Sequence, residues 1–344
     1  MAAGHVRPEG VLEDAILRVI RVPAESEGMR LDRFLSSQLR ATSRTRAQTI
    51  IETSAFGEDG RKLRASDRLR TEQRIYLWRP SFEEAPPPFE VRTLFEDAHL
   101  IVVDKPPLMT VHPTARHHFQ TVTKHLEQER PGQYISLIHR LDRDTSGVLL
   151  AAKSLEADRG FKMQLEERSI AAARAAEANE PVGRADKTYL AITWGVPADG
   201  LVNLPLEEDP SPLRVKMRVA ARGGLAARTG VRVLGVAGGY ALVECQLYTG
   251  RQHQIRVHLA SLGTPVVGDK LYGPDERLLA RSADNQLSAE DVALLEMPRH
   301  ALHAYQYRVT HCFTGQPMVF TAPLPEDMAE LWRAEGGDSG GFTG

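Results

Sequence analysis

The sequence predicts an α+β protein, and three observations support this class. Five apolar runs have the length of buried strands, at residues 100–103, 148–152, 189–193, 231–236 and 241–247. Turns rich in Gly and Pro separate these runs, and helical stretches lie between them. This order predicts a sheet with mixed or antiparallel pairing and flanking helices.

Residues 15–80 are predicted to form a small α+β domain of their own. Residues 16–22 alternate apolar and basic side chains, as a half-buried strand does. Apolar residues then recur at helical spacing, a second helix is expected to run to about Glu52, and Asp59-Gly60 is a turn signal before a strand at 75–78. The first helix is marked by Leu31, Phe34, Leu35 and Leu39.

A proline-rich linker is predicted at residues 81–89, SFEEAPPPF, because three consecutive prolines favour an extended spacer. The main domain then covers residues 90–328. Within it, the alanine-rich segment 171–186 and the segment 281–297 are predicted to be solvent-exposed excursions.

Composition excludes several classes of protein. The 344 residues contain no apolar run of about eighteen, so no membrane span is expected, and the N-terminus lacks the features of a secretory signal. The two cysteines, Cys245 and Cys312, give no disulfide framework and no metal-ligand spacing. His253 and His258 lie five positions apart without a third ligand, so no metal is predicted. The sequence therefore predicts a cytoplasmic protein.

Charge is distributed unevenly, although the net charge is only −2. Residues 28–80 contain twelve basic and six acidic residues, a local charge of +6, and residues 210–243 contain six basic residues and no acidic one. Such zones are suited to contacts with a phosphate backbone, or they are simply solvated basic faces. The candidate RNA-binding residues are Arg30, Arg33, Arg44, Arg46, Arg214, Lys216 and Arg218.

The segment from His139 to Gly147, HRLDRDTSG, is the most informative motif. It places Asp142 between two arginines at the entrance to the apolar run 148–152. Taken alone, such a cluster favours a surface turn with a local ion pair. Four further segments follow the same order as in one known family, together with the opening segment LFEDAHLIVVDKPP: these are Lys187-Thr188-Tyr189, TGRQHQIRVHL from Thr249, GDKLYG from Gly268 and RHALHA from Arg299. Together they resemble the RluA-type pseudouridine synthases, which isomerise uridine within RNA.

The resemblance implies a bent, mostly antiparallel mixed sheet with the RNA cleft across its middle. It also implies three catalytic residues: Asp142 as the essential carboxylate, Arg256 as its ion-pair partner and Tyr189 stacked on the target base near C5. The carboxylate can attack the sugar or the base, or abstract a sugar proton. Asp144 is the rival acid, and we assign it to the turn, where it can accept from the amides of Ser146 or Gly147.

Further positions in the motifs are expected to contact substrate: His139, Arg140, Arg251 and Leu259. The reaction needs no redox equivalent, ATP or metal, so no cofactor is expected. In the N-terminal domain, RLDRFL from Arg30 and Ser43-Arg44-Thr45-Arg46 resemble the small RNA-binding domain named after ribosomal protein S-four.

The expected partner is RNA, with ribosomal RNA favoured by the appended basic domain and transfer RNA left open. A monomer is expected. Two alternatives come from other classes. One is a non-catalytic RNA-binding factor with this fold. The other is a glycosidase or nucleoside hydrolase, which would need a second positioned carboxylate.

Overall fold

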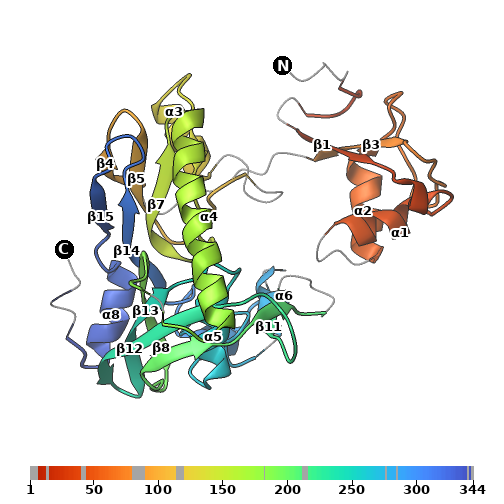
Figure 1. Cartoon of the computed structure of the whole chain (residues 1–344). Helices are drawn as coiled ribbons and strands as arrows, with labels where there is room; N and C mark the ends of the chain where they lie inside the picture. Colours follow the sequence, from red (N-terminus) through yellow and green to blue (C-terminus); the bar gives the residue numbers. More distant parts are fainter. Residues whose placement is uncertain are drawn as a thin grey trace. The chain divides into compact units, whose positions relative to one another are not determined.

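A computed structural model describes residues 7–12, 15–39, 44–79, 90–113, 120–181, 183–210, 216–275, 277–283, 286–338 and 341. The chain divides into two compact units (Figure 1). One, the N-terminal unit, runs from Met1 to Glu83. The other, the sheet unit, comprises Glu84–Asp209 and Lys216–Gly344. The linker expected at 81–89 lies outside the described residues.

The N-terminal unit is a three-stranded antiparallel sheet with two helices. Its strands are β1 (Ile16–Arg21), β2 (Ala55–Phe56) and β3 (Arg74–Arg79), in the order β1-β3-β2. A short 3-10 helix, η1 (Ala24–Ser26), precedes α1 (Leu31–Gln38) and α2 (Arg44–Ser54). Leu31, Phe34 and Leu35 have no exposed surface and pack against Ile51 and Leu77 in the unit's own core. The helical spacing read from the sequence is therefore confirmed.

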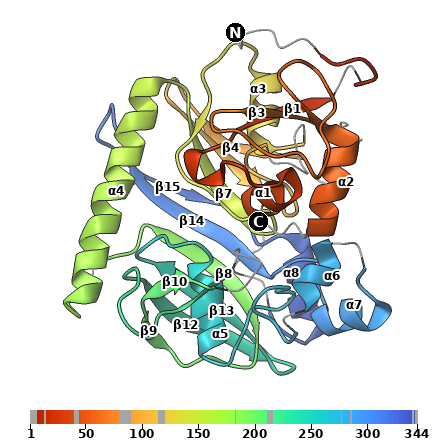
Figure 2. The ribbon, with the colours of Figure 1, turned by 90° about the vertical axis from the view of Figure 1, so that its right-hand side faces the viewer.

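The sheet unit is built on ten strands, of which eight follow the order β4-β5-β7-β14-β8-β13-β12-β9 (Figure 2). Two more pair at its side, β15 with β14 and β6 with β7. Every pairing is antiparallel except that of β7 with β14, so the expected mixed, mostly antiparallel sheet is confirmed. The strands are β4 (Arg92–Glu96), β5 (Leu100–Lys105), β6 (Ser136–Leu137), β7 (Ser146–Ala152), β8 (Lys187–Trp194), β9 (Gly200–Asn203), β12 (Arg228–Ala237), β13 (Tyr240–Leu247), β14 (Leu302–Thr310) and β15 (Pro317–Thr321).

A separate two-stranded ribbon of β10 (Leu206–Glu208) and β11 (Met217–Val219) completes the β structure described. The helices of the sheet unit within the described residues are α3 (Val122–Glu129), α4 (Leu155–Glu177), α5 (Gln254–Ser261), α6 (Leu278–Ala283), α7 (Ala289–Leu295) and α8 (Glu326–Ala334). The long helix α4 is capped at its N-terminus by Ser154, whose hydroxyl accepts from the amide of Ala157 at 3.1 Å. The negative charges of Glu156 and Asp158 in its first turn interact favourably with the helix dipole.

The two predicted excursions are wrong in part. Residues 171–177 continue α4, because alanine is the strongest helix former, and Ala172 and Ala176 are buried. The buried guanidinium of Arg228 on β12 donates to the carbonyls of Glu180 and Ala175, at 2.5 and 3.1 Å. In the second segment, Leu295 and Met297 are buried. Most of the other described residues of the two segments are exposed, so both are solvent-exposed segments that a few buried side chains fix to the unit.

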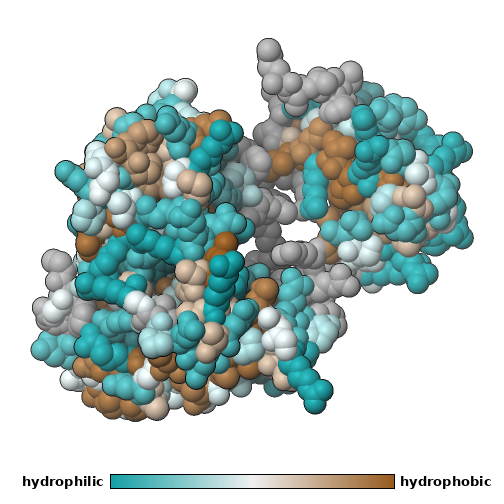
Figure 3. All heavy atoms as spheres, viewed as in Figure 1, coloured by the Kyte–Doolittle hydropathy of each residue, from teal (hydrophilic) through white to brown (hydrophobic). Residues whose placement is uncertain are grey.

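The surface is mainly polar. On the face in Figure 3, apolar side chains form separate patches among polar ones, as is usual for a water-exposed surface. Among the described residues, no helix combines the length and the apolar character that a membrane span requires.

Candidate active site

The loop between β6 and β7 carries Asp142. Because β6 and β7 pair in antiparallel fashion, the loop returns to the sheet within a few residues, and buried Leu141 fixes its tip to the core. The amide of Thr145 donates to the carbonyl of Asp142 at 3.2 Å, which closes a turn. The carboxylate of Asp142 remains 35 % exposed, so it is both held and accessible.

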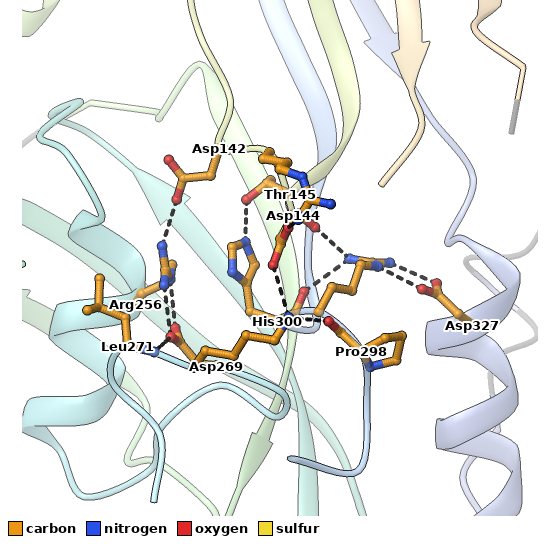
Figure 4. A network of polar contacts seen from close by, with 12 residues as sticks. Asp142, Asp144, Thr145, Arg256, Asp269, Leu271, Pro298, His300 and Asp327 are labelled. Carbon is orange, nitrogen blue, oxygen red and sulfur yellow. Dashed lines mark hydrogen bonds and ion pairs between the residues drawn. The ribbon is translucent and has the colours of Figure 1, made fainter. Parts of the chain in front are cut away.

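Arg256 on α5 connects two carboxylates (Figure 4). Its Nη1 donates to Asp142 Oδ2 at 2.9 Å. Its Nε and Nη2 donate to the two oxygens of Asp269, at 2.6 and 2.8 Å. Asp269 in turn accepts from the amides of Leu271 and Tyr272, at 2.9 and 3.0 Å. The guanidinium is thus fixed from behind, and its remaining edge faces Asp142.

The charges explain why Asp142 stays ionised. Burial raises the pKa of a carboxyl group, but the positive charge of Arg256 and its hydrogen bond outweigh this, and the pKa of Asp142 lies below its ordinary value. The pKa of Asp269 is also lowered, since Arg256 and the two amides overcome its complete burial. Both groups are carboxylates at neutral pH.

The segment from Arg299 to Ala304 anchors the Asp142 loop from the other side. Arg299, itself ion-paired with Asp327 at 2.7 Å, donates to the carbonyl of Asp144 at 3.2 Å. The His300 ring lies 2.7 Å from the hydroxyl of Thr145, as Figure 4 shows. His303 lies 2.9 Å from the hydroxyl of Ser146. The successive residues Asp144, Thr145 and Ser146 are therefore held by the segment that leads into β14.

Gly147 completes this junction. A Cβ there would lie 2.3 Å from the carbonyl oxygen of Ala304, and its φ is +107°, so only glycine fits where β7 and β14 meet in parallel.

Lys105, at the end of β5, is fully buried and binds backbone. Its ammonium donates to the carbonyls of Pro106, Met109 and Arg143, at 2.8, 2.7 and 3.0 Å. Burial lowers its pKa to about 7. It joins the turn after β5 to the Asp142 loop.

Asp144 has a different role from the one expected of it. It pairs with Arg143 at 3.0 Å and lies 3.7 Å from the ammonium of Lys270. No bond from its carboxylate to the amides of Ser146 or Gly147 is present among the described residues. The carboxylate of Asp144 therefore faces these two cations. Arg256 donates instead to Asp142, as Figure 4 shows.

Tyr189 lies on β8 and is 7 % exposed, in the same buried cluster as Leu141. Burial, and then the negative charge of Asp142, raise the pKa of its hydroxyl above the ordinary value. The phenol is therefore neutral and close enough to Asp142 to respond to its charge.

The four residues expected to contact substrate are placed differently from one another. Arg140 is exposed. His139 is half-buried, with its ring stacked on Tyr307 at 4.9 Å between centroids. Arg251 donates to the carbonyl of Ala226 at 3.0 Å. Leu259 has no exposed surface and packs in the main core, where its side chain fixes α5. The substrate contact expected of it stays a prediction.

The candidate RNA-binding residues also divide. Arg30 and Arg44 both bond to the buried carboxylate of Asp32, at 3.0 and 3.1 Å, whereas Arg33 is exposed. In the sheet unit, Lys216 lies over the ring of Tyr272, 5.9 Å from its centroid. The remaining candidates are exposed Arg46, Arg218, which pairs with Glu207 at 2.8 Å, and Arg214, which lies outside the described residues.

Sequence reasoning did not assign a role to Asp269, Tyr272, His253 or His300, although all four lie in the quoted motifs. The signal for Asp269 was available: a carboxylate two residues after the apolar pair Val266-Val267 needs a buried cation. No group of three or more His, Cys, Asp or Glu side chains suited to a metal is found within the described ranges.

Comparison with known proteins identifies the family of this chain. Residues 99–261 match the model of the family described as RNA pseudouridylate synthase. A ribosomal large subunit pseudouridine synthase D of Nitrosomonas europaea is 34 % identical over 97 % of this chain and 90 % of its own length. An uncharacterized RNA pseudouridine synthase of Chloroflexus aurantiacus is 36 % identical over 94 % of this chain and 96 % of its own. The solved structure of human RNA pseudouridylate synthase domain containing 4 covers 70 % of this chain and 92 % of its own, with 25 % identity and a TM-score of 0.52. The chain therefore belongs to the RNA pseudouridylate synthase family, whose members isomerise uridine within RNA.

Proposed function

We propose that this protein converts specific uridines of ribosomal RNA into pseudouridine, with the carboxylate of Asp142 acting on a nucleotide turned out of the RNA helix. The observation that carries the proposal is the Asp142–Arg256–Asp269 arrangement, an ionised carboxylate kept 35 % exposed on a loop that is held at several points. The likeness to the Nitrosomonas relative, named for the large ribosomal subunit, supports ribosomal RNA as the substrate.

The chemistry has three parts, and the site offers two groups that take part in it. The bond between N1 of uracil and C1′ of ribose breaks, the base turns, and a bond from C5 to C1′ forms while C5 loses its proton. Asp142 can attack the sugar or the base, or take a sugar proton, and all three roles require the ionised form that Arg256 maintains. Tyr189, neutral and beside Asp142, supplies an aromatic face for the freed uracil.

Extruding the uridine costs on the order of a few kcal/mol, which protein–RNA contacts must offset. In this proposal Arg140 and Lys216 supply part of these contacts, since Arg140 is exposed next to the loop and Lys216 lies over Tyr272 beside Arg256. The exposed arginines of the N-terminal unit, which we propose is an RNA-binding domain, supply the remainder. Because Asp142, Arg256 and Tyr189 all come from one chain, we propose that the protein acts as a monomer. We also propose that it acts in the cytoplasm.

A pseudouridine map of total RNA from cells with and without this protein tests the proposal. The expected result is the loss of one or a few pseudouridines in large-subunit ribosomal RNA when the protein is absent. Loss of pseudouridines only from transfer RNA would show that transfer RNA is the substrate instead. An unchanged map would contradict the proposed function. Release of free uracil by the purified protein would instead show a hydrolase.

A further inference from the structure

His253 occupies an unusual backbone position at the active site. It is the residue that precedes α5, and its φ of 56° and ψ of 15° lie in the left-handed region. A non-glycine residue in this region is strained, and such strain is retained where the surroundings fix the side chain. The imidazole is nearly buried, with 12 % of the side chain exposed, and it lies between Tyr272 and Asp142.

The hydrogen bonds around Tyr272 determine which nitrogen of His253 carries the proton. The amide of Met217 donates to the Tyr272 hydroxyl oxygen at 2.8 Å. Burial raises the pKa of Tyr272, so the hydroxyl keeps its proton. That proton has an acceptor in Nδ1 of His253, 2.9 Å away. If Nδ1 carried a hydrogen instead, the phenol would accept twice and its own proton would have no acceptor among the described residues, which costs free energy.

The second ring nitrogen then carries the hydrogen and is directed at the reacting carboxylate. Nε2 lies 3.8 Å from Oδ2 of Asp142, the same oxygen that accepts from Arg256. A hydrogen bond needs about 2.9 Å, and such contacts are often long in empty sites and shorten when substrate binds.

The charges that face His253 keep it neutral. Burial and the positive charge of Arg256 lower its pKa to about 4, against the opposing influence of Asp142 and Asp269. A neutral imidazole can donate a hydrogen bond to Asp142. Unlike an imidazolium, it does not release a proton that would neutralise the carboxylate.

We propose that His253 is a positioning residue for Asp142: Tyr272 fixes its tautomer, and its Nε2–H holds the carboxylate in its reacting orientation together with Arg256. The inference rests on the proposed function, because it assumes that Asp142 is the reacting group. Its structural part, the tautomer, can be measured without turnover.

The first test is ¹⁵N NMR of the full-length protein labelled at histidine, with a His253→Asn variant to assign the signal. At pH 7 the expected pattern is a neutral ring protonated at Nε2, which persists to below pH 6. In Tyr272→Phe, which keeps the ring over Arg256 but removes the hydroxyl, the preference for this tautomer should be lost. A ring protonated at Nδ1, or charged at pH 7, would overturn the proposal even if the enzyme is active.

The second test compares two substitutions with the wild-type enzyme on saturating RNA. His253→Asn suits the left-handed backbone and can still reach Tyr272, but its amide is too short to reach Asp142. His253→Gln places an amide donor near the position of Nε2. The Asn variant should lose roughly 10- to 100-fold in kcat, as expected for one hydrogen bond to a charged group.

The pH profile distinguishes positioning from simple loss of packing. A neutral Nε2–H that donates to Asp142 favours the ionised carboxylate, so the acid limb of kcat should move to higher pH in the Asn variant. The Gln variant should recover most of the rate with a normal limb. A folded Asn variant with wild-type kcat and an unmoved limb would contradict the positioning role, whereas absence of pseudouridine with the wild type would count against the proposed function instead.

Discussion

The side chain of Arg256 is used completely, which makes it the least replaceable cation of the site. Three of its nitrogens donate to two carboxylates, and its guanidinium lies over the ring of Tyr272 at 5.1 Å. A planar fork can serve Asp269 through one edge while it reaches Asp142 with another nitrogen, whereas an ammonium is a single point of charge. The geometry depends on arginine rather than on positive charge alone.

Arg256→Lys is therefore expected to lose at least about tenfold in kcat while RNA affinity changes little, because the lysine can pair with Asp269 or Asp142 but not with both. Single-turnover rates and filter binding on the same RNA would measure the two quantities. Arg232→Lys is the matched control, since Arg232 forms an exposed pair with Glu244 on β12 and β13. Equal rates for Arg256→Lys and the control would refute the importance of the fork.

At the scale of elements, the Asp142 loop depends on buried neutral histidines. Burial lowers the pKa of His300, His303 and His253 to about 4 each, from an ordinary 6.5. Between these values the unfolded chain binds more protons than the folded one, so the free energy of unfolding falls as pH drops through this window. Asp104, whose pKa burial raises to about 6, acts in the opposite direction but is one group against three.

The midpoint of thermal unfolding is therefore expected to decrease from pH 7 to pH 5, before most surface carboxylates begin to titrate. Calorimetry across this range measures it. His303→Asn removes one of the three groups and should make the decrease shallower. A midpoint that is constant or rises over these two pH units would show that the buried histidines do not control the stability of the loop.

The elements were predictable where they rest on local patterns. Continuous apolar runs located β5, β7 and β8, and helical spacing located α1, because burial of a whole strand or of one helix face is written into short segments. The parallel pairing of β7 with β14 was not predictable, since it joins segments about 155 residues apart through side chains such as Thr145 and His300.

The site residues, like the elements, were predictable from the sequence only in part. The motifs identified Asp142 and Arg256, which lie 114 positions apart in the chain. The role of Asp269 was missed because it depends on a contact between two segments, from Arg256 on α5 to Asp269, that the sequence alone does not show. The burial of Leu259 has a physical cause: Ile255 and Leu259 lie four residues apart, on the apolar face by which α5 packs into the core.

At the scale of the whole molecule, the N-terminal unit has its own hydrophobic core, and the predicted catalytic motifs all lie in the sheet unit. Removal of residues 1–80 is expected to leave a folded sheet unit with a similar rate on saturating RNA. Binding to long structured RNA should weaken and depend less on salt, because each lost phosphate contact lowers the salt slope by about 0.9 on duplex regions.

Affinities at several salt concentrations measure this effect. Within the full chain, Arg33→Ala should reduce the slope more than Arg30→Ala, because Arg33 is exposed while Arg30 is held by Asp32. An unchanged affinity and slope after truncation would show that the unit does not bind RNA and that its arginines form a solvated face.

The carboxylate of Asp142 is expected to perform the isomerisation, and substitution of Asp142 beside that of Asp144 is the decisive experiment. Purified wild type, Asp142→Asn and Asp144→Asn are incubated with large-subunit ribosomal RNA, and both pseudouridine formation and RNA affinity are recorded. The structure predicts turnover by the wild type and by Asp144→Asn, and none by Asp142→Asn, whose affinity stays within about tenfold, or roughly 1.4 kcal/mol. Turnover by Asp142→Asn together with an inactive Asp144→Asn would contradict the assignment.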